Sequence, residues 1–319
     1  MTGEAAFIHA LRAIATAPAA RRLADDAAVL RIGGEALVLT MDTVVEGVHY
    51  LPNDPPQDVA WKLVAVNVSD LSAKGATPAG CLYSHALGAS AWDTAFLAGL
   101  DEACRRFAIP LLGGDTVRMP DGAPRSFSLT ALGTGAKGCP VPSRTAARPG
   151  DRVWVSGTIG DAGLGLKAAL GDLDGDASAL TALLARYRRP APEPRLGVAL
   201  APLVHAMMDV SDGLMVDASR MAEASAVGVT LDVGAVPLSA AFRAVAGEVL
   251  EVRLAAMAAG DDYELLFTAP LENTARILEA ASTLNRQVTA IGTIEAGAGL
   301  SLHHEGAALP LPERLGYQH

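Results

Sequence analysis

The sequence predicts a two-domain protein of the α/β or α+β class. Its 319 residues exceed one average domain, and the hydrophobic half of them is enough for two cores. A stretch rich in proline and glycine at 139–150 reads as a linker, and both flanking halves mix strand and helix patterns. We therefore expect an N-terminal domain at 1–138 and a C-terminal domain at 151–319.

The spacing of apolar residues predicts the elements of each half. Helices are expected at 4–17, 57–74, 92–107, 161–171, 177–187, 194–201, 212–226, 248–259 and 271–282. Strands are expected at 36–41, 80–87, 109–113, 127–135, 151–156, 205–210, 229–233, 263–268 and 288–294. The first helix is interpreted as amphipathic and not as a signal peptide, because His9 and Arg12 interrupt its apolar run.

Composition excludes several classes of function. The net charge of −10 argues against nucleic acid as a partner, because phosphate backbones require basic patches. No apolar run is long enough for a membrane span, and the three cysteines form no CxxC pair, so a reducing cytoplasm is expected. Neither a GxxxxGK[ST] loop nor an HRD or DFG string occurs.

Aspartates at the ends of apolar elements, or within them, are the most informative feature. They are Asp26, Asp42, Asp70, Asp115, Asp209 and Asp212. Each alone is more often a cap or turn residue. Lysines and arginines are sparse around these motifs, so converging carboxylates would repel each other by about 4 kcal/mol per pair at about 4 Å. Divalent cations remove that cost, and carboxylate oxygens suit Mg²⁺.

Small residues surround the same aspartates. Gly113-Gly114-Asp115, Asp212-Gly213 and 156–161 (SGTIGD) let a ligand approach the backbone and present N–H groups to phosphate. Alone these glycines indicate only turns, but beside the carboxylates they indicate a nucleotide phosphate site. His49 and Arg144 taken alone read as ordinary surface or core residues.

These strings together resemble the thiamine-monophosphate kinase family, within the aminoimidazole-ribonucleotide synthetase superfamily. The resemblance covers nearly the whole chain in LTMDTVVEGVHY, VNVSDLSAKGATP, LLGGDTVR, MMDVSDGL and GDDYELLFT. It implies a two-domain synthetase-like fold whose N-terminal domain pairs in a homodimer to build a barrel. It also implies ATP and thiamine monophosphate as substrates, several Mg²⁺ ions, and an active site between the domains.

The resemblance also implies roles for individual residues. The implied metal ligands are Asp26, Asp42, Asp70, Asp209 and Asp212, with oxygens from Thr40, Met41 and Asp115. The implied ATP contacts are Gly114, Asp115, Arg144 and Ser211, and the implied substrate contacts are His49, Asp261 and Tyr317. Four positions depart from the family pattern: Ala24 replaces Gly, Met41 a hydroxyl residue, Asp261 a Glu, and Tyr317 a Phe or Trp.

The implied acceptor explains why no catalytic base is evident. A phosphate monoester has a second pKa of about 6, so at neutral pH it is already an oxyanion. We therefore expect direct in-line transfer of the γ-phosphoryl group, with Mg²⁺ neutralising both anions. Two alternatives stay open: another ATP-dependent synthetase of the superfamily, and a non-catalytic protein that binds nucleotide or metal.

Overall fold

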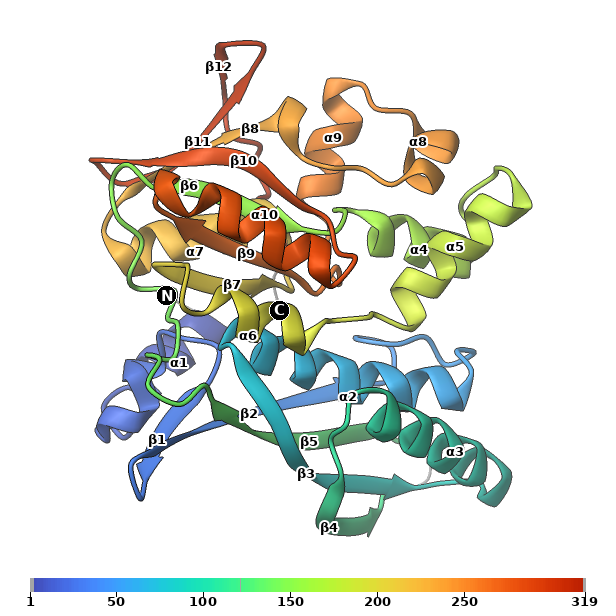
Figure 1. Cartoon of the computed structure of the whole chain (residues 1–319). Helices are drawn as coiled ribbons and strands as arrows, with labels where there is room; N and C mark the ends of the chain where they lie inside the picture. Colours follow the sequence, from blue (N-terminus) through green and yellow to red (C-terminus); the bar gives the residue numbers. More distant parts are fainter. Residues whose placement is uncertain (1–2, 121, 318–319) are drawn as a thin grey trace.

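The computed structural model describes residues 3–120 and 122–317, and its two β-sheets lie in separate halves of the molecule (Figure 1). Residues 1–2, 121 and 318–319, which the predicted domain ranges include, lie outside the described residues. The chain between Gly135 and Arg152 contains no helix or named strand among the described residues. The predicted mixed two-domain class is confirmed.

The N-terminal half is a five-stranded sheet with helices on one face. Its elements are α1 (Glu4–Leu11), η1 (Pro18–Leu23), β1 (Ala28–Ile32), β2 (Glu35–Val45), α2 (Pro56–Ala73), β3 (Ala76–Leu87), α3 (Ser90–Arg106), β4 (Leu111–Arg118) and β5 (Ser126–Gly135). The strand order is β1-β2-β5-β3-β4, and only the β3–β4 pair is parallel. Its core joins α2 and α3 to the inward side chains of β2, β3 and β5.

The C-terminal half is built on a seven-stranded sheet in the order β12-β11-β8-β10-β6-β9-β7. Its strands are β6 (Arg152–Ser156), β7 (Ala206–Val210), β8 (Gly228–Asp232), β9 (Glu264–Ala269), β10 (Val288–Glu295), β11 (Gly299–His304) and β12 (Ala307–Leu309). Its helices are α4 (Asp161–Leu170), α5 (Ala177–Arg188), α6 (Pro194–Leu200), α7 (Leu214–Ser225), α8 (Ala240–Ala246), α9 (Leu250–Met257) and α10 (Thr274–Thr283), with short turns η2 (Val233–Ala235) and η3 (Leu271–Asn273).

Helix α2 lies between the two halves and positions the site. One side contacts β2, β3 and β5, and the other contacts α6, β7 and β9. Its sequence is accordingly apolar around most of its circumference, and nearly all of its residues after Asp58 are buried. A helix packed on both sides is held rigidly, so polar side chains that it projects have fixed positions.

Several sequence predictions of elements were wrong. The first helix ends at Leu11 and not at 17, and its Phe7 is exposed. The chain reaches Pro18 soon afterwards, where a new short helix begins. Strands β1, β11 and β12 and helix α8 were missed; they are short and lack a strong apolar period. In the described chain no helix is long and apolar enough to cross a membrane.

Candidate active site

A cavity of 590 Å³ opens between the two halves of the molecule. Its walls come from β2, α2, the end of β7, the segment 258–263 and the C-terminal segment. The predicted site residues among its lining are Asp42, His49, Asp70, Asp209, Ser211, Asp212, Asp261 and Tyr317. Residues from both halves of the sequence thus meet in one cavity of the size that small-molecule ligands occupy.

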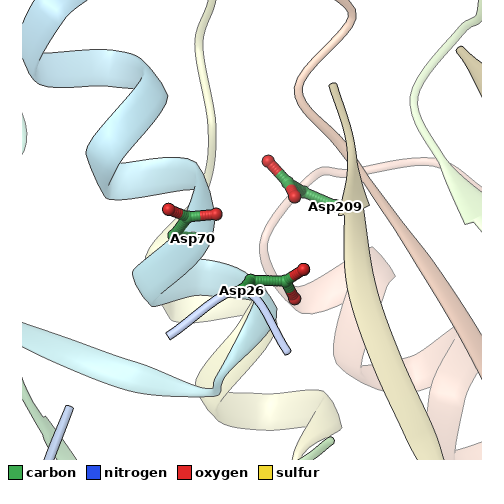
Figure 2. A group of neighbouring side chains, drawn as sticks. All are labelled: Asp26, Asp70 and Asp209. Atoms are coloured by element: carbon green, nitrogen blue, oxygen red, sulfur yellow. The ribbon is translucent and has the colours of Figure 1, made fainter. Parts of the chain in front are cut away.

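Three of the predicted metal ligands form one group at the edge of this cavity (Figure 2). Asp26 follows η1, Asp70 lies on α2 and Asp209 lies on β7, and each contributes a carboxylate oxygen within 4.8 Å of the other two. Figure 2 shows that the carboxylates of Asp70 and Asp209 approach one another from facing elements. Carboxylate oxygens gathered in this way suit a hard divalent cation.

The aspartates carry an electrostatic cost that a cation would remove. Burial, followed by the nearby charge of Asp212, raises the pKa of Asp42 to about 6. Burial also raises the pKa of Asp209 to about 6, with Asp217 and Asp42 adding to it. Burial, Asp42 and Asp209 hold the pKa of Asp70 well above its usual value. The donor set therefore fits Mg²⁺.

Strand β2 is held against helix α2 by polar contacts at its acidic end. The hydroxyl of Thr40 donates to the carboxylate of Asp70, and the backbone N–H of Asp42 donates to Asn67 Oδ1 at 3.0 Å. Asn67 is fully buried, and its amide donates to the carbonyl of Leu63 at 2.9 Å. The sequence did not predict this role for Asn67, because an asparagine inside a helix does not indicate which residue it bonds to.

The loop after β7 is organised by a buried aspartate that the sequence did not reveal. Asp217, on α7, accepts the backbone N–H groups of Ser211 and Asp212, both at 3.1 Å. It also accepts from Arg220 at 2.8 Å, and Arg220 lies 2.5 Å from Asp212. Gly213 is the N-cap of α7 and no side chain caps that helix. Asp212 is therefore no cap; its carboxylate lines the cavity and has one oxygen paired with Arg220.

The expectation that cations are sparse around the aspartates was wrong. Lys74 is completely buried and pairs with Asp25 and with Asp26, whose Oδ2 lies 2.7 Å from its ammonium. Arg144 also pairs with Asp26. Lys74 and Arg144 lie far from Asp26 in the sequence, so only the fold brings them together. Asp26 thus has protein cations on both carboxylate oxygens, whereas Asp212 pairs with Arg220 through one oxygen only.

The predicted substrate contacts gather around the cavity. His49 Nδ1 accepts the backbone N–H of Val45 at 3.1 Å, which folds the loop after β2. The backbone N–H of Tyr317 donates to the carbonyl of Asp212 at 2.8 Å, so the C-terminal segment is held beside this predicted metal ligand. Lys62 also lines this cavity and was not among the predicted site residues.

Some predicted residues lie elsewhere in the single chain. Gly114 and Asp115 lie on β4, an edge strand whose residues are all exposed and none of which lines the cavity. The side chain of Met41 is 62% exposed, whereas Thr40 and Asp42 on either side face α2. If Met41 binds a metal ion, it must therefore do so through its backbone carbonyl oxygen. The roles assigned to these residues stay predictions.

Comparison with known proteins agrees with this geometry. Residues 24–135 match the family "AIR synthase related protein, N-terminal domain", and residues 148–305 match its C-terminal counterpart. A thiamine-monophosphate kinase of Caulobacter vibrioides is 40% identical over 95% of this chain and 86% of its own length. The enzyme of Escherichia coli K12 is 35% identical over 93% of this chain and 91% of its own.

The chain belongs to the thiamine-monophosphate kinase family. Solved structures agree with this assignment. The thiamine-monophosphate kinase of Stenotrophomonas maltophilia K279a is 38% identical, with a TM-score of 0.79 over 89% of this chain and 90% of that one. AaThiL complexed with AMPPCP and TMP superposes with a TM-score of 0.85 at 28% identity, over 99% and 97% of the two chains. The predicted synthetase-like fold is thereby confirmed.

Proposed function

We propose that this protein transfers the γ-phosphoryl group of ATP to thiamine monophosphate, forming thiamine diphosphate and ADP. The observation that carries the proposal is the convergence of Asp42, Asp70, Asp209 and Asp212 on one cavity between the domains. Such a cluster can accept two phosphorylated ligands when divalent cations are shared between protein and phosphates. Relatives named for this activity match nearly the whole chain.

The transfer is a direct in-line displacement. An oxygen of the acceptor phosphate attacks the γ-phosphorus, the bond from that phosphorus to the β–γ bridging oxygen breaks, and ADP leaves. The acceptor is already an oxyanion at neutral pH, so no side chain has to remove a proton. When bound, Mg²⁺ supplies charge neutralisation for both ligands and for the transition state.

Roles for individual residues form part of this proposal. Asp26, Asp42, Asp70, Asp209 and Asp212 hold the ions, with the Thr40 hydroxyl, the Met41 carbonyl and Asp115 as further oxygen donors. Gly114, Asp115, Arg144 and Ser211 contact ATP, and His49, Asp261 and Tyr317 contact thiamine monophosphate. Asp26 is the weakest of the ion ligands, because Lys74 and Arg144 already neutralise its carboxylate.

We also propose that the chain works as a homodimer. One face of the five-stranded sheet packs on α2, and in Figure 1 the helices of this half lie on that face. The strand register places exposed apolar side chains on the opposite face. They are Leu30, Met41, Leu82 and Leu112, with exposed fractions between 40 and 62%. An uncovered apolar sheet face of this kind favours a second copy. A dimer would also bury β4, which carries Gly114 and Asp115.

The test is ADP release measured over a panel of phosphorylated acceptors, with thiamine as the unphosphorylated control. We expect ADP release that depends on Mg²⁺ and on thiamine monophosphate, and no release with thiamine. Asp42→Asn, Asp70→Asn and Asp212→Asn should each lower kcat steeply, whereas the exposed Asp174→Asn should not. Turnover with thiamine monophosphate at the wild-type rate in all three cavity variants would refute the metal assignment. A phosphorylated enzyme on the reaction path would refute direct transfer.

A further inference from the structure

The acceptor end of the cavity is built around a buried lysine. Lys62 projects from α2 with 3% of its side chain exposed. Its ammonium lies 2.6 Å from Asp261 Oδ2 and donates to the carbonyl of His49 at 3.0 Å. It also lies 4.3 Å from the centre of the Tyr187 ring, a distance at which a cation is attracted to the ring face. One ammonium therefore touches both segments proposed to contact thiamine monophosphate.

Asp261 is held through its backbone and through both carboxylate oxygens. Its backbone is in the left-handed region with φ of 71°, and its N–H donates to the carbonyl of Ser211 at 2.8 Å. Its Oδ1 accepts from the Tyr263 hydroxyl at 3.0 Å, while Oδ2 pairs with Lys62. Its side chain is nevertheless 31% exposed and lines the cavity. The carboxylate thus has a fixed orientation and one open side.

Lys62 connects two segments that belong to different halves of the molecule. His49 belongs to the loop after β2 in the N-terminal half, and Asp261 belongs to the segment before β9 in the C-terminal half. A buried ammonium without hydrogen-bond partners is energetically costly, so the Lys62 ammonium stays bonded to the His49 carbonyl and to the Asp261 carboxylate. Their separation is therefore set by the reach of one side chain anchored on the rigid helix α2. In this chain Asp261 stands where the family pattern has the longer Glu. How far its carboxylate extends into the cavity therefore depends on where Lys62 and Tyr263 hold it.

We propose that Lys62 is a positioning residue for the acceptor: it orients the Asp261 carboxylate and sets its distance from the His49 loop. The inference rests on the proposed function. Lys62 bonds to the two segments proposed to contact thiamine monophosphate, and it bonds to none of the proposed ion ligands Asp42, Asp70, Asp209 and Asp212. Its loss should therefore weaken the binding of thiamine monophosphate. Binding of Mg²⁺ and ATP should change little.

The experiment compares Lys62→Met, Lys62→Arg, Asp261→Asn and the double variant Lys62→Met/Asp261→Asn with the wild-type enzyme. The exposed Lys137→Met is the control of equal charge change. Calorimetry with thiamine monophosphate, Mg²⁺ and a non-hydrolysable ATP analogue measures acceptor affinity, and steady-state kinetics measures KM for each substrate. Circular dichroism establishes that each variant is folded, and Lys62→Arg retains a cation if Lys62→Met fails to fold.

We expect Lys62→Met to raise the Kd and KM for thiamine monophosphate by roughly tenfold or more, as the loss of one charged hydrogen-bond pair would. The KM for ATP should stay within roughly threefold, a change well under one such bond. Lys62→Arg should recover part of the loss, and Lys137→Met should behave as wild type. The double variant should bind the acceptor no more weakly than Asp261→Asn, because Lys62 acts through that carboxylate.

Two results would overturn the inference alone: unchanged acceptor affinity in Lys62→Met, or losses that add in full in the double variant. A wild-type enzyme that neither binds nor phosphorylates thiamine monophosphate would instead overturn the proposed function, and this inference with it.

Discussion

Replacing Asp209 by Asn should stabilise the protein in the absence of metal while weakening its hold on Mg²⁺. Asp209 is 4% exposed, and its Oδ2 accepts the Ser69 hydroxyl at 2.6 Å. An asparagine oxygen can accept the same hydrogen bond at the same position. The substitution therefore removes the charge from the aspartate cluster and preserves the local packing.

The magnitude follows from the pKa of Asp209, which burial raises from 3.8 to about 6. A shift of about two units corresponds to about 3 kcal/mol. Because the folded-state pKa lies above the unfolded value, the folded state binds more protons between these values. The contribution of Asp209 to stability is thus fully present below pH 3.8 and is lost as the pH rises through about 6. At pH 7.5 the ionised carboxylate costs about 3 kcal/mol, and Asn removes that cost.

Urea unfolding in EDTA, measured across the pH range, tests this reasoning. Asp209→Asn should exceed the wild type by about 3 kcal/mol at neutral pH, and the difference should shrink toward zero as the medium becomes acidic. With Mg²⁺ and ATP added, the order should reverse, because the wild type gains more from ligand binding. The exposed Asp174→Asn is the control and should match the wild type throughout. An Asp209→Asn protein less stable than the wild type in EDTA at neutral pH would refute the electrostatic account.

Three further predictions follow from other contacts. Arg220 pairs with Asp212 at 2.5 Å and so competes with a metal cation for that carboxylate. Arg220→Met should therefore tighten Mn²⁺ binding in the absence of nucleotide by roughly three- to tenfold, as measured by electron paramagnetic resonance. Weaker Mn²⁺ binding in this variant would contradict the prediction. Leu82→Glu on the uncovered sheet face should give monomers in analytical ultracentrifugation, whereas Leu278→Glu on α10 should leave the assembly unchanged; a dimeric Leu82→Glu chain would place the interface elsewhere. A Cβ at Gly197 would lie 1.9 Å from a carbonyl oxygen of α2. Gly197→Ala should therefore lower the free energy of unfolding, measured in urea, by about 1–3 kcal/mol. An unchanged urea midpoint would show that α6 moves away from α2 at no cost.

Much of the fold could be predicted because long elements carry their own apolar period. Helices α2 and α3 and strand β5 appear within one or two residues of their expected ranges. The short strands β11 and β12 pair at the edge of the larger sheet and have little apolar pattern to reveal them. Strand β11 forms by pairing with the edge of β8, and β12 forms by pairing with β11, so both depend on a neighbouring strand.

The acidic cluster was visible in the sequence because each aspartate sits at the end of an apolar element or within one. The hydrogen-bond and ion-pair partners of the site's aspartates were not visible. Lys62 and Asp261 are separated by 199 positions, and Ser69 and Asp209 by 140. No local pattern indicates such pairs, and the same holds for the support that Asp217 gives to the loop after β7.

The order of residues by itself determined the mixed class, the family and the acidic character of the site, since these depend on composition, period and local motif. Tertiary structure alone decided which aspartates face one another, which are paired with a protein cation, and which lysine joins the His49 loop to Asp261. The physical reason is that electrostatic energy depends on distance and burial in space, and the packing of α2 between two sheets sets both.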